Sequence, residues 1–298
     1  MKLDFIIIGG QKCGSTYLHH IINEHPDISM VSGESPEFET PDYENGGLEK
    51  LKNKIQKLDQ NKVIGIKRPN YLCSEEVPER LFKESPNAKL IVILRNPVER
   101  LKSSYFHQIN NGFCPVLDIN TGVKKLLDGS LNESYPRTKN IIKYGFYSSY
   151  LKKYINLFEH NLLVLTYDEL RENRDQVIKK CYKFLNVDES FVPQKEINKR
   201  PQKVTYSIPR VKFLVKANKY RFSYNKNKTR LFEKKQNLWD ILNYSIIKGV
   251  DKYILNYFFK NEKPELSEKN KLKLIEIYKD DIQALESLIN CDLNSWEK

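Results

Sequence analysis

Residues 4–16 read DFIIIGGQKCGST and continue as YLHHII over residues 17–22. A short apolar run leads into a glycine-flanked loop, after which Leu18, Ile21 and Ile22 follow at helical spacing. This order of strand, loop and helix is typical of a phosphate-binding site, because the first N–H groups of a helix lack partners within it and the helix dipole favours anions there. We therefore expect an anion site in this loop; an ordinary strand-to-helix turn is the alternative.

The loop differs from the nucleoside triphosphate loop G-x-x-x-x-G-K-[ST] in one respect. Gly9, Gly14 and Thr16 match that pattern, but Ser15 stands at the lysine position and Lys12 lies inside the loop instead. In the triphosphate loop this lysine reaches the β- and γ-phosphates. Its displacement argues against ATP, disfavours a nucleotide kinase, and favours a ligand with a different group beyond its first phosphate.

Four further apolar runs have the length of buried strands, and they span residues 28–31, 63–66, 89–94 and 162–165. Helical patterns separate them, which is typical of a parallel sheet covered on both faces. Ligands bind at the carboxyl ends of such strands, where Glu34, Lys67, Arg68 and Arg95 would join the glycine loop. The sequence therefore predicts an α/β fold with a P-loop-type parallel sheet flanked by helices and with additional C-terminal helices.

The length and composition of the chain limit the class of protein to which it can belong. The chain has 298 residues, of which 40% are hydrophobic, enough for a proper core. No apolar run reaches the length of a signal-peptide core or of a membrane span, so we expect a cytoplasmic protein. The five cysteines occur singly, and we expect neither disulfides nor a metal site. We expect one domain over residues 1–298, with a core at about 4–190 and a basic, helical part at about 191–298.

The net charge of +12 is concentrated in one segment. Residues 197–238 contain 13 Lys and Arg against a single acid, Glu233. Such a block can bind acidic ligands, nucleic acid or anionic membrane, or it can be a solvated loop. Its interleaved aromatic residues could stack on bases, although such residues more often serve packing. A non-catalytic nucleotide-binding protein that docks on nucleic acid or membrane through this segment is therefore one hypothesis.

Three segments together resemble the sulfotransferases that use 3′-phosphoadenosine 5′-phosphosulfate (PAPS); they read GQKCGST over 10–16, KRPNY over 67–71 and ILRNPVERLKSSY over 93–105. The pattern is most similar to the heparan-sulfate-type and bacterial carbohydrate sulfotransferases. The similarity covers at least residues 5–187, and DLNSW at 292–296 is also typical of bacterial members. Arg95 followed eight residues later by Ser103, after a loop of this kind, is specific to that family.

The resemblance implies roles for the residues at the strand ends. Lys12 would bind the 5′-phosphosulfate together with the loop residues Gln11, Cys13, Gly14, Ser15 and Thr16. Arg95 and Ser103 would bind the 3′-phosphate, which suits a planar guanidinium. Lys12 and Lys67 would stabilise the charge that develops on the leaving oxygen, and this chemistry needs no metal.

The resemblance also implies a general base. Heparan-sulfate-type members use a glutamate nine residues past a His-Pro pair, and His25-Pro26 is followed at that distance by Glu34. No histidine lies near Lys67, where phenol and steroid sulfotransferases place theirs. The aromatic pattern after Glu34 is only partly kept, so Glu37 is the alternative base.

The expected reaction is in-line transfer of the sulfuryl group of PAPS to a hydroxyl, or with less support an amine, of a saccharide-like or glycolipid acceptor. No nucleic acid partner is expected, and residues 197–238 could contact an anionic surface. The identity of the acceptor and the oligomeric state are not readable from the sequence.

Overall fold

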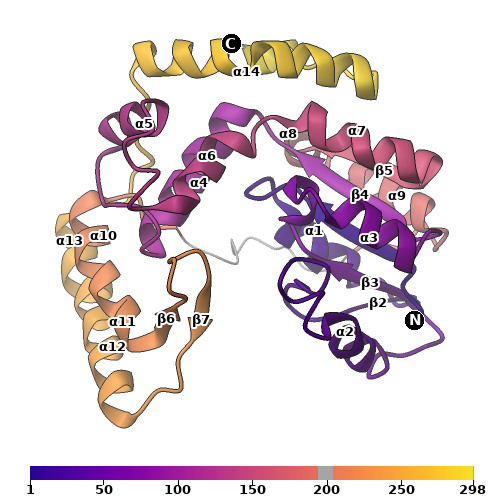
Figure 1. Cartoon of the computed structure of the whole chain (residues 1–298), viewed down its shortest axis with the longest axis horizontal. Helices are drawn as coiled ribbons and strands as arrows, with labels where there is room; N and C mark the ends of the chain where they lie inside the picture. The colour runs from indigo at the N-terminus through magenta and orange to yellow at the C-terminus, as the bar shows by residue number, and fades with distance from the viewer. Residues whose placement is uncertain (194–203, 298) are drawn as a thin grey trace. The chain divides into compact units, whose positions relative to one another are not determined.

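The computed structural model describes residues 1–193 and 204–297 (Figure 1). The chain forms two compact units; the first comprises Met1–Arg100, Phe146–Pro201 and Lys279–Lys298, and the second comprises Leu101–Gly145 and Gln202–Tyr278. The chain thus leaves the first unit after Arg100 and returns to it twice. The single domain over 1–298, with its core at about 4–190 and its basic, helical part at about 191–298, stays a prediction.

The first unit is built on a five-stranded sheet with the strand order β2-β3-β1-β4-β5. Its strands are β1 (Phe5–Gly9), β2 (Ile28–Met30), β3 (Val63–Lys67), β4 (Lys89–Leu94) and β5 (Leu162–Thr166). Every neighbouring pair is parallel, for example with Ile6 opposite both Ile66 and Leu90. The predicted α/β fold with a parallel sheet is confirmed, and each predicted strand is present.

Helices cover the sheet and explain why its central strands are apolar throughout. The helices of this unit are α1 (Ser15–Ile22), α2 (Gly47–Ile55), α3 (Val77–Glu84), α7 (Tyr147–Phe158), α8 (Tyr167–Glu172) and α9 (Arg174–Leu185). The α1 and α9 helices contact each other, and they contact β1 and β5 respectively, while α3 contacts α7 and α7 contacts β4 and β5 (Figure 1). All of β1 is buried, as a strand between two helical layers requires.

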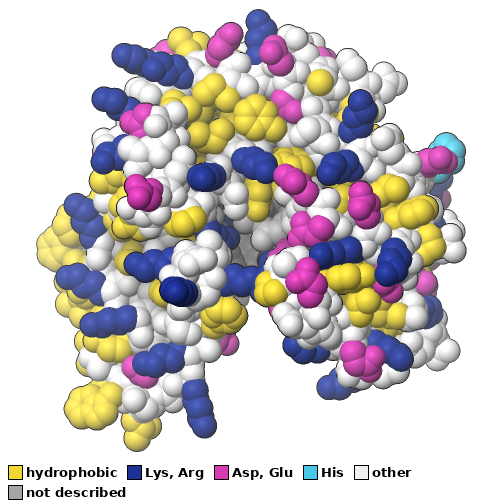
Figure 2. All heavy atoms as spheres, viewed as in Figure 1, with side chains coloured by type: hydrophobic (Ala, Val, Ile, Leu, Met, Phe, Trp, Pro, Cys, Tyr) yellow, Lys and Arg dark blue, Asp and Glu magenta, His cyan; other side chains and the backbone are white. Residues whose placement is uncertain are grey.

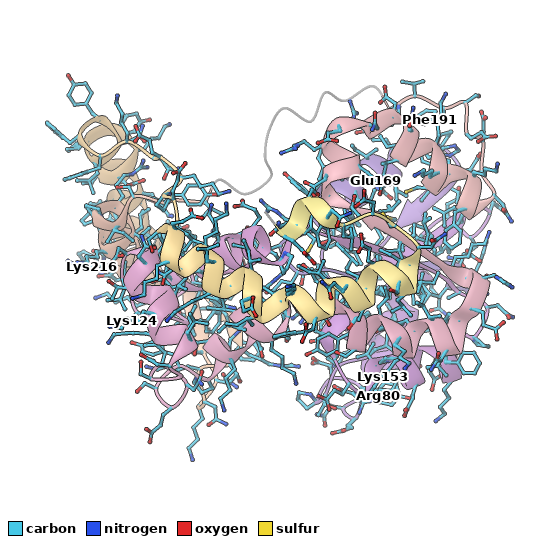
Figure 3. The ribbon with its side chains drawn as sticks, turned by 90° about the horizontal axis from the view of Figure 1, so that it is seen from above. Arg80, Lys124, Lys153, Glu169, Phe191 and Lys216 are labelled. Carbon is cyan, nitrogen blue, oxygen red and sulfur yellow. The ribbon has the colours of Figure 1, made fainter. Side chains whose placement is uncertain are left out.

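Local capping fixes the residues that follow β4 and β5. The α4 helix (Pro97–Asn110) begins with proline, and the Asn96 side chain accepts hydrogen bonds from the Val98 and Glu99 N–H groups at 2.9 and 3.2 Å. The α8 helix begins with a capping box between Thr166 and Glu169, the latter labelled in Figure 3. These caps hold the residues at the carboxyl ends of both strands, Arg95 among them, in defined positions.

The second unit is mostly helical. It contains parts of α4 and of α14 (Glu268–Ile289), a short antiparallel hairpin of β6 (Phe222–Tyr224) and β7 (Leu231–Glu233), and the helices α5 (Ile119–Leu127), α6 (Lys139–Lys143), α10 (Ile208–Leu214), α11 (Asn218–Arg221), α12 (Leu238–Val250) and α13 (Asn256–Phe258).

The basic segment 197–238 lies partly outside the described residues, which resume at Val204 and form α10, α11 and the hairpin. Within the described part of the chain, no helix is both long and apolar enough to cross a membrane.

Candidate active site

The glycine loop joins the carboxyl end of β1 to the start of α1. Its backbone is fixed to the sheet because the Gly10 N–H donates to the Ile93 carbonyl at 2.7 Å. Lys12 and Gly14 both have left-handed backbones, with φ of 66° and 102°. A Cβ atom at Gly14 would lie 3.0 Å from the Tyr167 ring, so this position requires glycine. No side chain among the described residues caps α1, which leaves its first N–H groups available to an anion.

Two cations lie beside this loop, Lys12 within it and Arg95 at the end of β4. The Arg95 guanidinium donates to the Lys12 carbonyl at 3.4 Å, contacts Glu99 at 3.4 Å, and lies 4.6 Å above the Tyr167 ring. Burial lowers the pKa of Lys12, and the nearby charge of Arg95 lowers it further. A polyanion would relieve this repulsion, so the donor set fits a nucleotide that carries phosphate and phosphosulfate groups.

The structure brings Glu34, Lys67 and Thr16 together on the other side of the loop. The Lys67 ammonium donates to the Thr16 hydroxyl at 3.2 Å and lies 3.7 Å from the Glu34 carboxylate. The segment after β2 is fastened to β3, because the Ser35 N–H donates to the Lys67 carbonyl at 3.0 Å. Burial lowers the pKa of Lys67, and the charge of Glu34 partly offsets this effect. A carboxylate, an ammonium group and the first turn of α1 thus form one cluster.

The two candidate bases occupy different environments. The Glu34 side chain is 44% exposed, whereas that of Glu37 is 5% exposed and forms a 2.5 Å ion pair with Lys54 on α2. An acceptor molecule can therefore reach Glu34 from solvent, while Glu37 is enclosed by protein. The choice between Glu34 and Glu37 as the base stays a prediction.

Sequence reasoning did not assign roles to Arg68, Glu39 and Tyr167. Arg68 donates to both oxygens of Glu39 at 2.6 Å each and to Glu34 at 2.6 Å, so one guanidinium holds two carboxylates. Tyr167 follows β5 directly and contacts Arg95. The rule that ligands bind at strand ends placed Arg68 at this edge without giving it a role, and it could also have pointed to Tyr167, which comes immediately after a strand.

Two predicted loop residues make contacts within the first unit. The Gln11 amide donates to the Asn70 side chain at 2.9 Å, which ties the loop to the segment after β3. Cys13 is fully buried, with its sulfur 3.6 Å from the Tyr147 hydroxyl, and burial raises the pKa of its thiol. The cysteine therefore fills space in the core rather than presenting a reactive thiolate.

The remaining predicted residues lie on helices. Ser15 and Thr16 form the first turn of α1, where Ser15 is buried and Thr16 is half-buried. Ser103 lies on α4, in the part of that helix that belongs to the second unit. Its part in binding a 3′-phosphate with Arg95 stays a prediction.

No group of three or more His, Cys, Asp or Glu side chains that could hold a metal ion occurs within residues 1–193 and 204–297. The expectation that the reaction needs no metal stays a prediction.

Residues 2–255 match the family model described as "Sulfotransferase domain". The chain is 36% identical over 108 residues to the membrane-associated sulfotransferase kil1 of Dictyostelium discoideum, covering 36% of this chain and 23% of that protein. It is 34% identical over 100 residues to human (Homo sapiens) heparan sulfate glucosamine 3-O-sulfotransferase 5, covering 34% and 29%. Over 208 residues it is 29% identical to human bifunctional heparan sulfate N-deacetylase/N-sulfotransferase 1, covering 66% and 24%. The chain thus spans about a quarter of the length of these curated relatives.

Solved structures share the fold. A crystal structure of a sulfotransferase from Alicyclobacillus acidocaldarius superposes with a TM-score of 0.70 at 19% identity, over 100% of both chains. Mouse sulfotransferase SULT7A1, crystallised as a complex with PAP, gives a TM-score of 0.51 at 18% identity, over 95% of this chain and 84% of the other. These likenesses confirm the architecture inferred from the strand and helix patterns.

Proposed function

Because the chain belongs to the sulfotransferase domain family, whose model matches residues 2–255, we propose that it transfers the sulfuryl group of PAPS to a hydroxyl of a saccharide-like or glycolipid acceptor, with an amine as the less supported alternative. One observation carries this assignment more than any other. Glu34 and Lys67 lie 3.7 Å apart beside the start of α1, where no side chain of the described residues caps the helix; this supports the proposal that a base and a cation flank the glycine loop.

The donor would be bound by the cations and N–H groups around the loop. Lys12 and the first turn of α1 would hold the 5′-phosphosulfate, and Arg95 would bind the 3′-phosphate together with Ser103. Charge-assisted hydrogen bonds of this kind are about twice as strong as neutral ones. The electrostatic strain between Lys12 and Arg95 supports this placement, as does the presence of PAP in the mouse structure named above.

The chemical step requires a base and charge stabilisation. As the acceptor oxygen bonds to sulfur, Glu34 would accept the hydroxyl proton. The bond between sulfur and the bridging oxygen breaks at the same time, and Lys12 and Lys67 would stabilise the negative charge that this oxygen gains. The hydrogen bond from Lys67 to Thr16 supports this role, because it holds the ammonium group at the start of α1.

Arg68 supports the same assignment by orienting the base. Its hydrogen bonds to both Glu39 oxygens leave it fixed, and it presents one further N–H to Glu34. Arg68 binds Oε2 of Glu34, whereas Oε1 lies 3.7 Å from the Lys67 ammonium, so the two cations together set the direction of this carboxylate. We therefore assign Arg68 as a positioning residue.

A saccharide acceptor is supported by the printed names of two relatives, which are heparan sulfate sulfotransferases. The experiment is an acceptor screen with sulfur-35-labelled PAPS over oligosaccharides, glycolipids and small phenols. We expect label in a saccharide-containing product, with the Lys12→Ala variant as the inactive control. Transfer to phenols alone would overturn the acceptor class, and no transfer to any acceptor class would overturn the proposed activity.

A further inference from the structure

The α12 helix differs in orientation from the usual helix at a water-exposed surface. Such helices bury their apolar face and expose their polar face. Here Asp240 and Asp251 are buried, whereas Leu242 and Ile246 are about half exposed and Trp239 is 73% exposed. The helix segment thus buries two acidic residues and keeps Ile247 and Val250 half-buried, while several of its other apolar side chains face outward.

Ion pairs within the second unit fix this orientation. Asp251 accepts two hydrogen bonds from Arg210, at 2.8 and 2.9 Å, and Asp240 pairs with Lys234 at 3.0 Å. Breaking the buried Arg210–Asp251 pair is costly, because it leaves a charge unpaired in the interior, whereas Lys234 is partly exposed and its pair contributes less. The helix therefore cannot roll its apolar face inward without losing both pairs.

Six of the exposed apolar side chains lie along one side of this segment, here called the apolar stripe; they are Leu238, Trp239, Leu242, Ile246, Tyr253 and Tyr257. Ile241, Ile254, Phe258 and Phe259 in the same segment are exposed as well. Most residues of the apolar stripe follow one another at four-residue spacing, as one side of a helix requires. Gly249 falls on the same side and has no atom within 4 Å of the position a Cβ would take. The stripe runs along α12, the π-helical turn at Asp251–Leu255 and α13, a length of about 30 Å.

Positive charge predominates in the segment that carries the apolar stripe. Residues 204–263 contain 14 Lys and Arg against four Asp and Glu. Three of these acids, Glu233, Asp240 and Asp251, form ion pairs inside the unit. Lys248 and Lys252 lie on α12 and the π-helical turn and are exposed. Figure 2 shows hydrophobic side chains at the left-hand edge, over α12 and α13, with Lys and Arg side chains beside them.

An exposed apolar stripe beside an excess of positive charge limits the kinds of partner that can bind here. A second copy of the chain would bring like charge against like charge. Nucleic acid would satisfy the lysines, but it offers no apolar surface to cover leucine and isoleucine. An anionic lipid surface suits both the apolar stripe and the lysines, because acyl chains cover the apolar side chains and headgroups neutralise the positive charge.

We propose that the apolar stripe docks the protein on anionic membrane, with α12 and α13 lying in the plane of the interface. Trp239, Tyr253 and Tyr257 suit that depth, since their rings are apolar and their polar atoms can remain hydrated. Four charged side chains, at Asp240, Lys248, Asp251 and Lys252, agree with a helix that lies on the bilayer rather than crossing it. This inference goes beyond the proposed activity and does not depend on it.

The test is flotation of the full-length protein with vesicles of phosphatidylcholine alone or mixed with phosphatidylglycerol. We expect strong binding to the mixed vesicles and weak binding to the neutral ones. The double variant Leu242→Ser, Ile246→Ser should lower the partition coefficient by about 100-fold, since each buried aliphatic side chain contributes about tenfold or more. Lys248→Gln with Lys252→Gln should lower binding to anionic vesicles by roughly 30-fold. The matched control is Leu272→Ser, which removes an exposed leucine outside the stripe and should bind as wild type does.

A second measurement needs no variant. The chain has two tryptophans, and Trp296 is buried whereas Trp239 belongs to the apolar stripe. Anionic vesicles should therefore shift the wild-type emission to shorter wavelength, and brominated lipids should quench it. Unchanged emission together with no flotation would overturn the inference, and so would equal flotation of the stripe variant and wild type. It would also be overturned if the only effect of the stripe variant were to dissociate a dimer or to lose binding to an oligonucleotide.

Discussion

Exchange of Glu34 for glutamine tests the proposed general base more cleanly than any other single change. The amide keeps the shape of the side chain but cannot take the acceptor proton. Loss of a general base lowers turnover by about 10²- to 10⁴-fold. Donor affinity should stay nearly unchanged, because the proposed donor contacts are made by Lys12, Arg95 and the start of α1. Stability should change by at most about 1 kcal/mol, since the Glu34 carboxylate is half exposed.

Glu37→Gln is the matched control from the same loop. This carboxylate is enclosed and forms a 2.5 Å ion pair with Lys54, whose own side chain is 45% exposed. The variant should lower the free energy of unfolding by about 1–2 kcal/mol, as expected for loss of a hydrogen bond to a charged group. Its turnover should remain within a few fold of wild type.

The assay is initial-rate transfer from labelled PAPS at saturating acceptor, with urea unfolding of each variant alongside. Glu34→Gln should be slow and stable, and Glu37→Gln should be active and less stable. The reverse pattern would mean that Glu37 is the base. Full activity in both variants would contradict general-base catalysis by either carboxylate.

Three further outcomes are expected. Arg95→Ala should weaken binding of 3′-phosphoadenosine 5′-phosphate by roughly 30- to 1000-fold while barely affecting its 3′-dephosphorylated analogue, measured by titration calorimetry; equal losses would make Arg95 structural. Gly14→Ala should lower the free energy of unfolding by about 1–2 kcal/mol, because it forces alanine into a left-handed backbone against the Tyr167 ring. Burial lowers the pKa of His19 from 6.5 to about 4. As the pH falls from 6.5 to 4, the unfolded chain therefore binds a proton at His19 before the folded chain does, and the free energy of unfolding should fall by up to about 3 kcal/mol. His19→Gln should flatten this slope in urea titrations at each pH, and an unchanged slope would assign it to other groups.

The sheet was predictable because its central strands are buried on both faces. The KLIVIL run at 89–94 has no polar residue beyond its first position, and only a strand between helical layers tolerates that pattern. The neighbourhood of Glu34, Lys67 and the glycine loop was predictable for a related reason. Parallel strands bring their carboxyl ends to one edge, so segments far apart in sequence meet there.

Which charged residues pair with one another at that edge was not predictable, because it depends on the conformation of the loops after the strands. Nothing in the sequence shows that Arg68 binds Glu39 as well as Glu34, or that Lys54 pairs with Glu37. These pairs join residues that are 17 to 34 positions apart and belong to different elements.

The orientation of α12 could not be predicted from the sequence pattern either. The apolar residues of Leu238–Val250 would ordinarily indicate a buried face. The structure instead buries Asp240 and Asp251, because Lys234 and Arg210 supply their counter-charges. The β6–β7 hairpin was missed because three-residue strands such as Phe222–Tyr224 are too short to show an alternating pattern.

The central claim is that the glycine loop binds a 3′-phosphorylated adenine nucleotide, and calorimetric titration in EDTA tests it most directly. 3′-Phosphoadenosine 5′-phosphate should bind without added metal and far more tightly than ATP, because Lys12 is displaced from the triphosphate pattern and the proposed role of Arg95 is to bind the 3′-phosphate. Binding that vanishes with EDTA, or that is equal for ATP, would contradict the assignment.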